Sequence, residues 1–506
     1  MYFIDKVVNY NALSIKVFNF VRKFGSMKLV TRFIISAFLL AWFNSTAQVG
    51  INTTSPDSSS ALDIVSTTQG VLTPRMTSVQ RVGISTPAQG LLVYDTDEQS
   101  FYYFDVGWQK LSTNNKRTNY KLVKSVADLS DERTAGGGSI YVLNTDFLYE
   151  INGTIIFDLP IDINGAYIEG VDSGEDVIVN NSGATFFQGT TGGSIRNLTI
   201  AGNGNQVFNI TGTGTELLVI NNSIFAGASS LGSIDALGTV FFSIIQYVNN
   251  SDGFALSNMG SLLMSNLFWT DSNSGTFATI TGTFDNLQMG SGRIEADTGE
   301  VGLDVSANPV IVNEASLSGL SFVGAGTLVQ RYTAGSYPGF NFTTDWSVNC
   351  SGIPTETDDQ STANFYSTSV ITSGFTQDVT NGTATPILGG GTFENTELFR
   401  FRSNAANNRL IYEGEKTRNF QINASLSIRL NNADGNFYSF LIARNGVVVD
   451  DSDSLVLIAS DTQIQSVSLN TVVTMNTGDF IEVYVQRLTG TGTDRLDVFS
   501  ENLTIR

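Results

Sequence analysis

The sequence predicts an all-β protein built around a parallel β-helix, a solenoid in which short strands stack turn upon turn. Short apolar runs flanked by Gly, Asn, Ser and Thr return every twenty-odd residues between Ser139 and Gln330, a period typical of solenoids. The composition agrees, because 49 Gly, 34 Phe and only 15% charged residues are typical of turn-rich β-proteins. Apolar and polar residues alternate strictly from Phe420 to Leu430, which predicts an antiparallel domain after the solenoid.

A chain of 506 residues exceeds what one hydrophobic core usually supports, so several parts are expected. Shifts in composition and linker-like runs divide the sequence. The predicted parts are a signal peptide with an upstream extension (1–47), a small attachment module (48–112), a linker (113–138), the parallel β-helix (139–345), a second linker (346–369) and a C-terminal domain (370–506).

The N-terminal segment has the pattern of a secretory signal peptide. Met27 offers a second start beside Met1, basic residues follow it, and residues 33–43 form an apolar run before the small residues 45–47. We expect the mature chain to begin at Gln48 and to be secreted or to stay on the cell surface. Eleven apolar residues would span about 16 Å, so no stable transmembrane anchor is expected.

Charge and cysteine content exclude some classes of function. A formal net charge of −20 disfavours binding to nucleic acid or to anionic membrane surfaces. The single cysteine, Cys350, forbids an intrachain disulfide and is interpreted as a small buried side chain.

The recurring runs of the solenoid predict which side chains point inward. The runs begin at residues 197, 222, 243, 266, 286 and 319. Thr, Ser and Asn side chains are expected to form rows on the solvent-facing surface of the stacked turns. The predicted inward residues are Leu198, Ile200, Ile224, Ile244, Leu267, Leu287 and Leu320.

The first module carries a series of motifs in a characteristic order. The module closes on an aromatic run and Gly107-Trp108, and the motifs before them are, in order, Val49–Asn52, Ala61–Ile64, Gly70–Thr77, Gln80-Arg81 and Pro87–Asp97. Thr73 as N-cap and Pro74 at the first helical position predict one short helix through Val82. The order of motifs resembles the N-terminal module of secreted surface proteins of Gram-negative bacteria and of phage tail fibres. That resemblance implies an attachment role without chemistry, and the signal peptide favours a bacterial surface protein over a virion component.

The C-terminal residues also carry a resemblance. Apolar strands flank Asn445-Gly446, a strong hairpin signal, and Thr477–Val485 forms another strand after a Gly-Asp turn. These motifs resemble the C-terminal jelly roll of phage and bacterial tail proteins, which is similar to tumour-necrosis-factor and complement-type domains. The resemblance implies a homotrimer; a monomeric sandwich is the alternative.

Residue content limits the chemistry. The chain contains no histidine, which excludes Ser-His-Asp and Cys-His nucleophile systems and His-based zinc sites. The solenoid offers only Arg196, Arg293 and Arg331 as cationic side chains, where polysaccharide lyases need a basic residue and often calcium. We interpret each arginine as a surface ion-pair partner.

Carboxylates are the remaining catalytic candidates, because glycoside hydrolysis needs only two of them at suitable spacing. Glu295 and Asp297 lie two residues apart and could pair with Asp271 or Asp285 from nearby turns. Surface solvation explains the same residues in a chain this acidic. The sequence therefore leans against an enzyme without excluding one.

Two further clusters suggest ligands. Asp450, Asp451 and Asp453 crowd one loop and offer oxygen ligands of the kind calcium takes, although a solvated turn is the alternative; no other cofactor is expected. An aromatic cluster near the end of the solenoid would either stack on sugar rings or seal the last turn. It consists of Tyr332, Tyr337, Phe340, Phe342 and Trp346.

Together these features predict an extracellular binding or structural protein, an adhesin or fibre that presents a trimeric C-terminal domain on a β-helix stalk to a glycan or another cell-surface ligand. A β-helix carbohydrate-active enzyme, hydrolase or lyase-like, is one alternative. A phage tail-fibre receptor-binding protein is the other.

Overall fold

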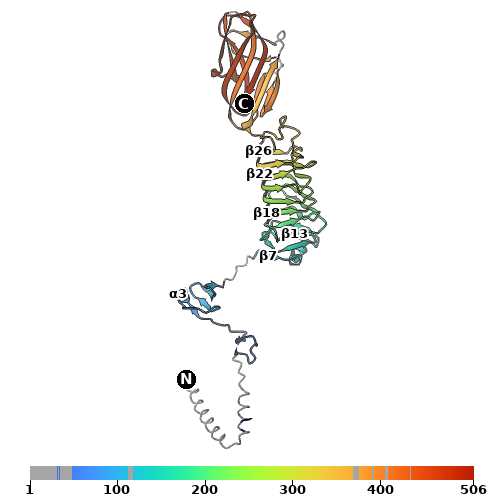
Figure 1. The fold of residues 1–506 in the computed structure, drawn as a ribbon, viewed down its shortest axis with the longest axis vertical. Coiled ribbons are helices and arrows are strands. Elements are labelled where there is room, and N and C mark those ends of the chain that lie inside the picture. The colour runs from blue at the N-terminus through green and yellow to red at the C-terminus, as the bar shows by residue number, and fades with distance from the viewer. Residues whose placement is uncertain are drawn as a thin grey trace. The chain divides into compact units, whose positions relative to one another are not determined.

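The computed structural model describes residues 31, 33–34, 48–111, 118–368, 375–389, 393–404, 408–433 and 435–506. Of the described residues, 55% lie in strands and 6% in helices, so the all-β prediction is confirmed. The chain separates into two compact units, residues 1–115 and 116–506, which are described separately (Figure 1).

The first unit contains two small sheets. Strands β1 and β2 pair in parallel, β3 pairs in parallel with β4, and β4, β5 and β6 are antiparallel. The elements are β1 (Val49–Ile51), β2 (Leu62–Ile64), β3 (Arg75–Met76), α3 (Ser78–Val82), β4 (Leu92–Asp95), β5 (Ser100–Phe104) and β6 (Trp108–Lys110).

Helix α3 begins later than predicted. The sequence placed its N-cap at Thr73, whereas Thr77 is the N-cap and forms a capping box with Gln80. Residues 75–76 cannot be helical because they pair with β4. The helix then places Arg81 in the interior, with Nε 2.8 Å from Asp95 Oδ2 and the guanidinium 3.7 Å from the Tyr102 ring centroid.

The predicted signal peptide in residues 1–47 lies outside the described residues, apart from residues 31, 33 and 34. Among the residues that are described, no helix has both the length and the apolar character needed to cross a membrane.

The second unit begins with the solenoid. Twenty strands form one continuous parallel sheet wound into about nine turns, which confirms the predicted β-helix (Figure 1). The strands are β7 (Tyr120–Val123), β8 (Tyr141–Val142), β9 (Leu148–Ile151), β10 (Thr154–Phe157), β11 (Ile161–Asp162), β12 (Tyr167–Glu169), β13 (Val177–Asn180), β14 (Phe187–Gly189), β15 (Gly193–Arg196), β16 (Thr199–Ala201), β17 (Gln206–Thr211), β18 (Leu217–Ala226), β19 (Ser230–Asp235), β20 (Thr239–Val248), β21 (Phe254–Trp269), β22 (Thr276–Glu295), β23 (Val301–Asp304), β24 (Val310–Val323), β25 (Thr327–Gln330) and β26 (Trp346–Ser351).

The ends of the solenoid extend into both predicted linkers. Strand β7 pairs with β9 although it lies within segment 113–138, because Val123 enters the core of the first turn. A 3-10 helix, η1 (Val126–Leu129), and helix α4 (Ser130–Ala135) follow, and Leu129 covers the same core. At the other end β26, within segment 346–369, pairs with β24.

Aromatic rings stack through the interior from turn to turn. Phe225, Tyr247 and Trp269 occupy register positions on successive strands. The Phe225 and Tyr247 ring centroids are 5.9 Å apart, and those of Tyr247 and Trp269 are 5.6 Å apart. All three side chains are buried, but the Tyr247 hydroxyl has no hydrogen-bond partner among the described residues.

Two buried asparagines form a ladder at one bend. Asn250 Nδ2 donates to Asn273 Oδ1 at 2.9 Å and to the Phe225 carbonyl oxygen. Asn273 Nδ2 donates to the Tyr247 carbonyl oxygen at 2.9 Å. The ladder satisfies backbone groups that would otherwise be buried without partners at this bend.

One corner of the solenoid is a column of residues in the left-handed backbone conformation. Asparagine and glycine tolerate this conformation, whereas a β-branched residue there is strained. Asn222 Nδ2 donates to Asn197 Oδ1 at 3.0 Å, which links two members of the column. The column consists of Asn197, Asn222, Ile244, Asn266, Ser291 and Gly319, with φ between 48° and 67°.

This corner corrects two of the predicted inward residues. Leu198, Ile200, Leu267, Leu287 and Leu320 are buried as predicted. The prediction is wrong for the other two, because Ile224 is half-buried and faces outward and Ile244 is 46% exposed. A left-handed residue shifts the alternation of inward and outward side chains along the strand. The inward positions are therefore occupied by the next residues in the sequence, Phe225 and Ile245.

The C-terminal domain consists of two antiparallel sheets that share one core. Alternation in β33 is confirmed, since Phe420 and every second residue to Leu430 are buried. The predicted hairpin at Asn445-Gly446 joins β34 to β35. The first sheet contains β27 (Thr362–Thr368), β28 (Phe375–Thr380), β30 (Glu394–Phe399), β33 (Arg418–Asn431), β37 (Gln465–Met475) and β39 (Thr493–Ile505). The second contains β29 (Thr385–Pro386), β31 (Phe401–Asn404), β32 (Arg409–Tyr412), β34 (Asn436–Arg444), β35 (Val447–Val448), β36 (Ser454–Ile458) and β38 (Phe480–Arg487), and η2 (Asp358–Gln360) and η5 (Asp450–Ser452) are 3-10 turns.

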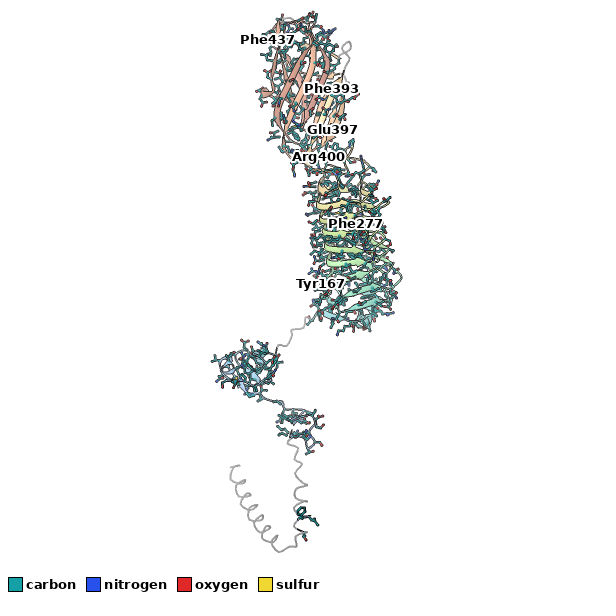
Figure 2. All side chains as sticks on the ribbon, viewed as in Figure 1. Tyr167, Phe277, Phe393, Glu397, Arg400 and Phe437 are labelled. Atoms are coloured by element: carbon teal, nitrogen blue, oxygen red, sulfur yellow. The ribbon has the colours of Figure 1, made fainter. Side chains whose placement is uncertain are left out.

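Arg400 joins this domain to the last turn of the solenoid (Figure 2). Its guanidinium is buried and donates to the carbonyl oxygens of Thr344, Trp346 and Glu356 at 2.7, 2.6 and 3.1 Å. Nη1 also lies 2.8 Å from Asp358 Oδ1. In the described part of the chain no further turn follows the last strand of the solenoid, so no backbone N–H groups of a next strand donate to these carbonyl oxygens. The Arg400 side chain donates to them instead.

Glu501 on β39 is an ionisable residue buried within the sandwich. Its Oε1 accepts a hydrogen bond from Asn408 Nδ2 at 3.4 Å, and Oε2 has no partner among the described residues. Burial raises the pKa of Glu501 to about 8, while the hydrogen bond from Asn408 acts in the opposite direction.

Two tyrosines of the solenoid provide a matched test of its core. Tyr247→Phe should leave the free energy of unfolding unchanged or raise it by up to about 1 kcal/mol, because the lost hydroxyl has no partner. Tyr149→Phe should lower it by about 1–3 kcal/mol, because that buried hydroxyl donates to Glu132 and accepts from the Asn144 N–H. Urea unfolding measures both, and equal losses would contradict the assignment.

The stability of the C-terminal domain should fall at alkaline pH. Because the folded-state pKa of Glu501 is above its unfolded value, its contribution is complete below about pH 4.5 and is lost as the pH rises through about 8. We expect Glu501→Gln to reduce the stability difference between pH 6 and pH 9 by about 2–3 kcal/mol in urea titrations. The surface variant Asp378→Asn should keep the wild-type difference.

Candidate functional site

The early turns of the solenoid carry two adjoining hollows of about 420 and 440 Å³. Both are lined by Tyr167, Ser194 and Arg196, so they form one continuous depression, which we call the groove. Figure 2 labels Tyr167 on these turns. The first hollow continues over Glu216 and Leu217, and the second over Asn119 and Asp146.

Strand register explains how the groove is built. In β12 the side chain of Ile168 is buried, so its neighbours Tyr167 and Glu169 face outward. Parallel pairing then places Glu169 beside Glu150 of β9 on one side and beside Arg196 of β15 on the other. The outer surface therefore carries a row of two carboxylates and one guanidinium along successive turns.

Neighbouring side chains orient the two carboxylates. The Tyr120 hydroxyl donates to Glu150 Oε2 at 2.9 Å, and Asn197 Nδ2 donates to Glu169 Oε1 at 3.3 Å. Burial, followed by the hydrogen bond to Glu150, raises the pKa of Tyr120. Each carboxylate thus keeps an oxygen without a protein donor in the described part of the chain.

Arg196 differs from the other solenoid arginines. Its Nε donates to Ser194 Oγ at 3.0 Å, which directs the rest of the guanidinium outward. No carboxylate of the described residues lies within salt-bridge distance of it. The interpretation of the arginines as ion-pair partners is therefore wrong for Arg196, whereas Arg293 does pair with Glu295 at 3.2 Å.

The groove has the features of a saccharide site. Tyr167 is 46% exposed and offers an aromatic face on which a sugar ring could stack. Carboxylate oxygens, a guanidinium and the Asn164 amide lie around it as partners for hydroxyl groups. Glu216 is less available, because hydrogen bonds from Thr213, opposed by burial, lower the pKa of Glu216 to about 2 and hold it to its own turn.

The carboxylates singled out in the sequence are spread over the surface of the later turns. Asp271, Asp285 and Asp297 are exposed, and Glu295 is half-buried beside Arg293. Asp271 and Asp297 follow the paired residues Trp269 and Ile294 on adjacent turns. Asp285 lies ten residues before Glu295 on β22, on the far side of the left-handed corner residue Ser291, so the structure does not bring it to that pair.

Two of the three aspartates of the predicted calcium loop accept hydrogen bonds from different strands, and the third is exposed. The Thr471 hydroxyl donates to Asp451 Oδ1 at 2.9 Å, and the Ser439 hydroxyl donates to Asp453 Oδ1. Asp450 is exposed at the start of η5. Throughout the described ranges, no three His, Cys, Asp or Glu side chains converge in a way that could hold a metal ion.

The predicted aromatic cluster divides into two groups. Tyr332, Phe342 and Trp346 are buried and close the core of the last turn, where Trp346 Nε1 donates to the Tyr332 hydroxyl at 2.9 Å. Phe340 stacks on Phe399 of the C-terminal domain at 3.9 Å, and Tyr337 donates to Glu413 at 2.8 Å. The cluster therefore closes the core of the last turn and connects it to the C-terminal domain. Its rings are not free to stack on a sugar.

Sequence reasoning missed Tyr167, Glu150 and Glu169. A signal was present, because Leu148–Ile151, Tyr167–Gly170 and Ser194–Asn197 share one pattern of outward, inward and outward residues. Aligning these short runs would have placed the two glutamates and Arg196 in one row. Their spacings of 19 and 27 residues are irregular, which hid the repeat.

Comparison with known proteins identifies the first module. Residues 50–124 match the family model described as "Phage tail like trimerisation region". No curated protein matches the chain.

Some solved structures are distantly similar to this chain. The enzymatically active domain of tailspike protein 4 from bacteriophage CBA120 is 11% identical over 86% of this chain and 77% of its own, with a TM-score of 0.25. The phiAB6 tailspike, solved with oligosaccharides of Acinetobacter baumannii surface polysaccharide, is 10% identical over 83% and 100%, with a TM-score of 0.22. Eiger TNF from S. frugiperda is 12% identical over 28% and 90%, with a TM-score of 0.18. Likenesses this distant carry no argument about function.

The trimerisation match covers the first module and continues through strand β7 at the start of the solenoid, whereas the sequence predicts trimer contacts in the C-terminal domain. The matched region favours the phage tail-fibre alternative over the broader adhesin interpretation. Residues 50–124 are thus similar to phage tail-like trimerisation regions.

Proposed function

We propose that the protein is a homotrimeric receptor-binding protein of the phage tail-fibre type, whose solenoid binds a cell-surface saccharide in the groove. The observation that carries the proposal is the groove itself, which the half-exposed Tyr167 ring, the Arg196 guanidinium without an ion-pair partner and the Glu169 carboxylate line together, with Glu150 paired to Glu169 on the next strand. The trimerisation match supports three copies. Three grooves on one particle would raise avidity for a repeating polysaccharide.

The remaining sequence predictions complete this proposal. The C-terminal sandwich is a jelly roll of the tumour-necrosis-factor type that strengthens the trimer. The chain acts outside the cell. If residues 1–47 are a signal peptide, the protein is a bacterial surface protein of tail-fibre type and not a virion component, and N-terminal sequencing of the exported protein will begin at Gln48. Retention of residues 1–47 in exported protein would refute that cleavage site.

A second candidate function, saccharide cleavage, rests on the pairing of Glu150 with Glu169. The backbones of directly paired residues in parallel strands lie about 5 Å apart. Side chains that leave the sheet in the same direction can then hold their carboxyl groups at the roughly 5–5.5 Å found in retaining glycosidases. In this case Glu150→Gln and Glu169→Gln should each abolish release of oligosaccharides and retain binding. Chromatography of polysaccharide digests decides between binding and cleavage.

Removal of the groove side chains should weaken binding. Tyr167→Ala and Arg196→Gln should each reduce the affinity for host polysaccharide at least tenfold, because a stacking face or a charged donor is lost. Glycan arrays followed by calorimetry on the full chain measure this. The control replaces Asp271, Asp285, Glu295 and Asp297 together by Asn or Gln and should change the affinity by no more than a few-fold. If the control loses affinity and the groove variants keep it, the binding site lies on the later turns.

A further inference from the structure

Three consecutive long strands of the solenoid differ from the rest of this acidic chain. The chain has a formal net charge of −20, yet no residue of β18, β20 or β21 is charged. Many of their outward positions are apolar as well. We call these side chains the apolar ridge: Leu217, Val219, Phe241, Ile244, Leu263 and Phe268.

Register aligns the central part of the ridge. Val219 pairs with Phe241, and Phe241 pairs with Leu263, so the backbones of these three residues lie in line on successive turns about 5 Å apart. Leu217 is 53% exposed at one edge of this row. Beyond the corner, Ile244 and Phe268 are two further apolar side chains, 46% and 44% exposed, and Phe268 pairs with Gln246 and Arg293. The row of Val219, Phe241 and Leu263 is apolar surface of the kind that marks an interaction site.

Ile244 is the anomalous member of the ridge. It occupies the left-handed corner column with φ 57°, where the other members are Asn, Ser or Gly. A β-branched residue in this conformation is strained. Because nearly half of its side chain is exposed, packing within the chain compensates for the strain only in part. A contact made outside the chain would explain why isoleucine stands here.

We propose that the apolar ridge is a contact between copies of this chain. The inference rests on the trimer in the proposed function, because the first module, which matches a trimerisation region, brings three solenoids together at high local concentration. Copies that are strongly acidic repel one another, so a surface without charge is where they can approach.

The ridge suits a second copy better than a saccharide. A sugar hydroxyl that is desolvated there finds few partners, since the ridge side chains are hydrocarbon or aromatic. Leu217 and Val219 also line the groove, so the contact borders the saccharide site and places each groove next to a subunit boundary.

The test compares three single variants of the full chain by sedimentation across dilution, with urea added if dilution alone does not dissociate the trimer. Phe268→Ser should dissociate at a protein concentration at least tenfold higher than the wild type. Ile156→Thr is the matched control, because Ile156 on β10 is 59% exposed and lies outside the ridge, and it should behave like the wild type.

Ile244→Asn tests whether Ile244 stabilises the trimer or is merely an exposed apolar residue. Its trimer should weaken at least tenfold, while the dissociated chain should unfold at a higher urea concentration than the wild type because the strain is relieved. A trimeric wild type whose Phe268→Ser and Ile244→Asn variants dissociate like Ile156→Thr would overturn the ridge contact alone. A wild type that is monomeric at all concentrations would overturn both the contact and the trimer of the proposed function.

Discussion

In-register hydrogen bonding between parallel turns is the constraint on which this protein depends. Each strand of the solenoid pairs with the strand one turn before and one turn after it, so the backbone of every turn is satisfied only by its neighbours. A residue's position along its strand then fixes whether it joins the core, a corner or an outer row. The stacked rings, the asparagine ladder, the groove and the apolar ridge are all rows generated by this rule.

The groove and the ridge show how one scaffold supports two kinds of surface. Early turns are short and carry tyrosine, glutamate and arginine in their outer rows, whereas β18, β20 and β21 are long and uncharged. The inner rows barely change between these regions, because Ile168, Ile195, Ile220 and Phe242 follow one another in register. Outer rows can therefore vary in chemistry while the core keeps the turns aligned.

The sequence was informative where periodicity is regular. Alternation from Phe420 to Leu430 and the Asn-Gly hairpin are local signals, and both match the structure. The left-handed corner was harder to predict, because Ile244 occupies a position where an asparagine would have indicated a left-handed residue. The groove was missed because the two glutamates and Arg196 come together only through turns of unequal length. No single run shows this pairing, and only an alignment of several runs reveals it.

Arg400 has a mechanical consequence. Its guanidinium binds three carbonyl oxygens of the segment that ends the solenoid, and its backbone lies inside the C-terminal sandwich, between β30 and β31. A force that pulls the sandwich away from the last turn must therefore break these hydrogen bonds and the ion pair with Asp358 together, in addition to extending the connecting segment.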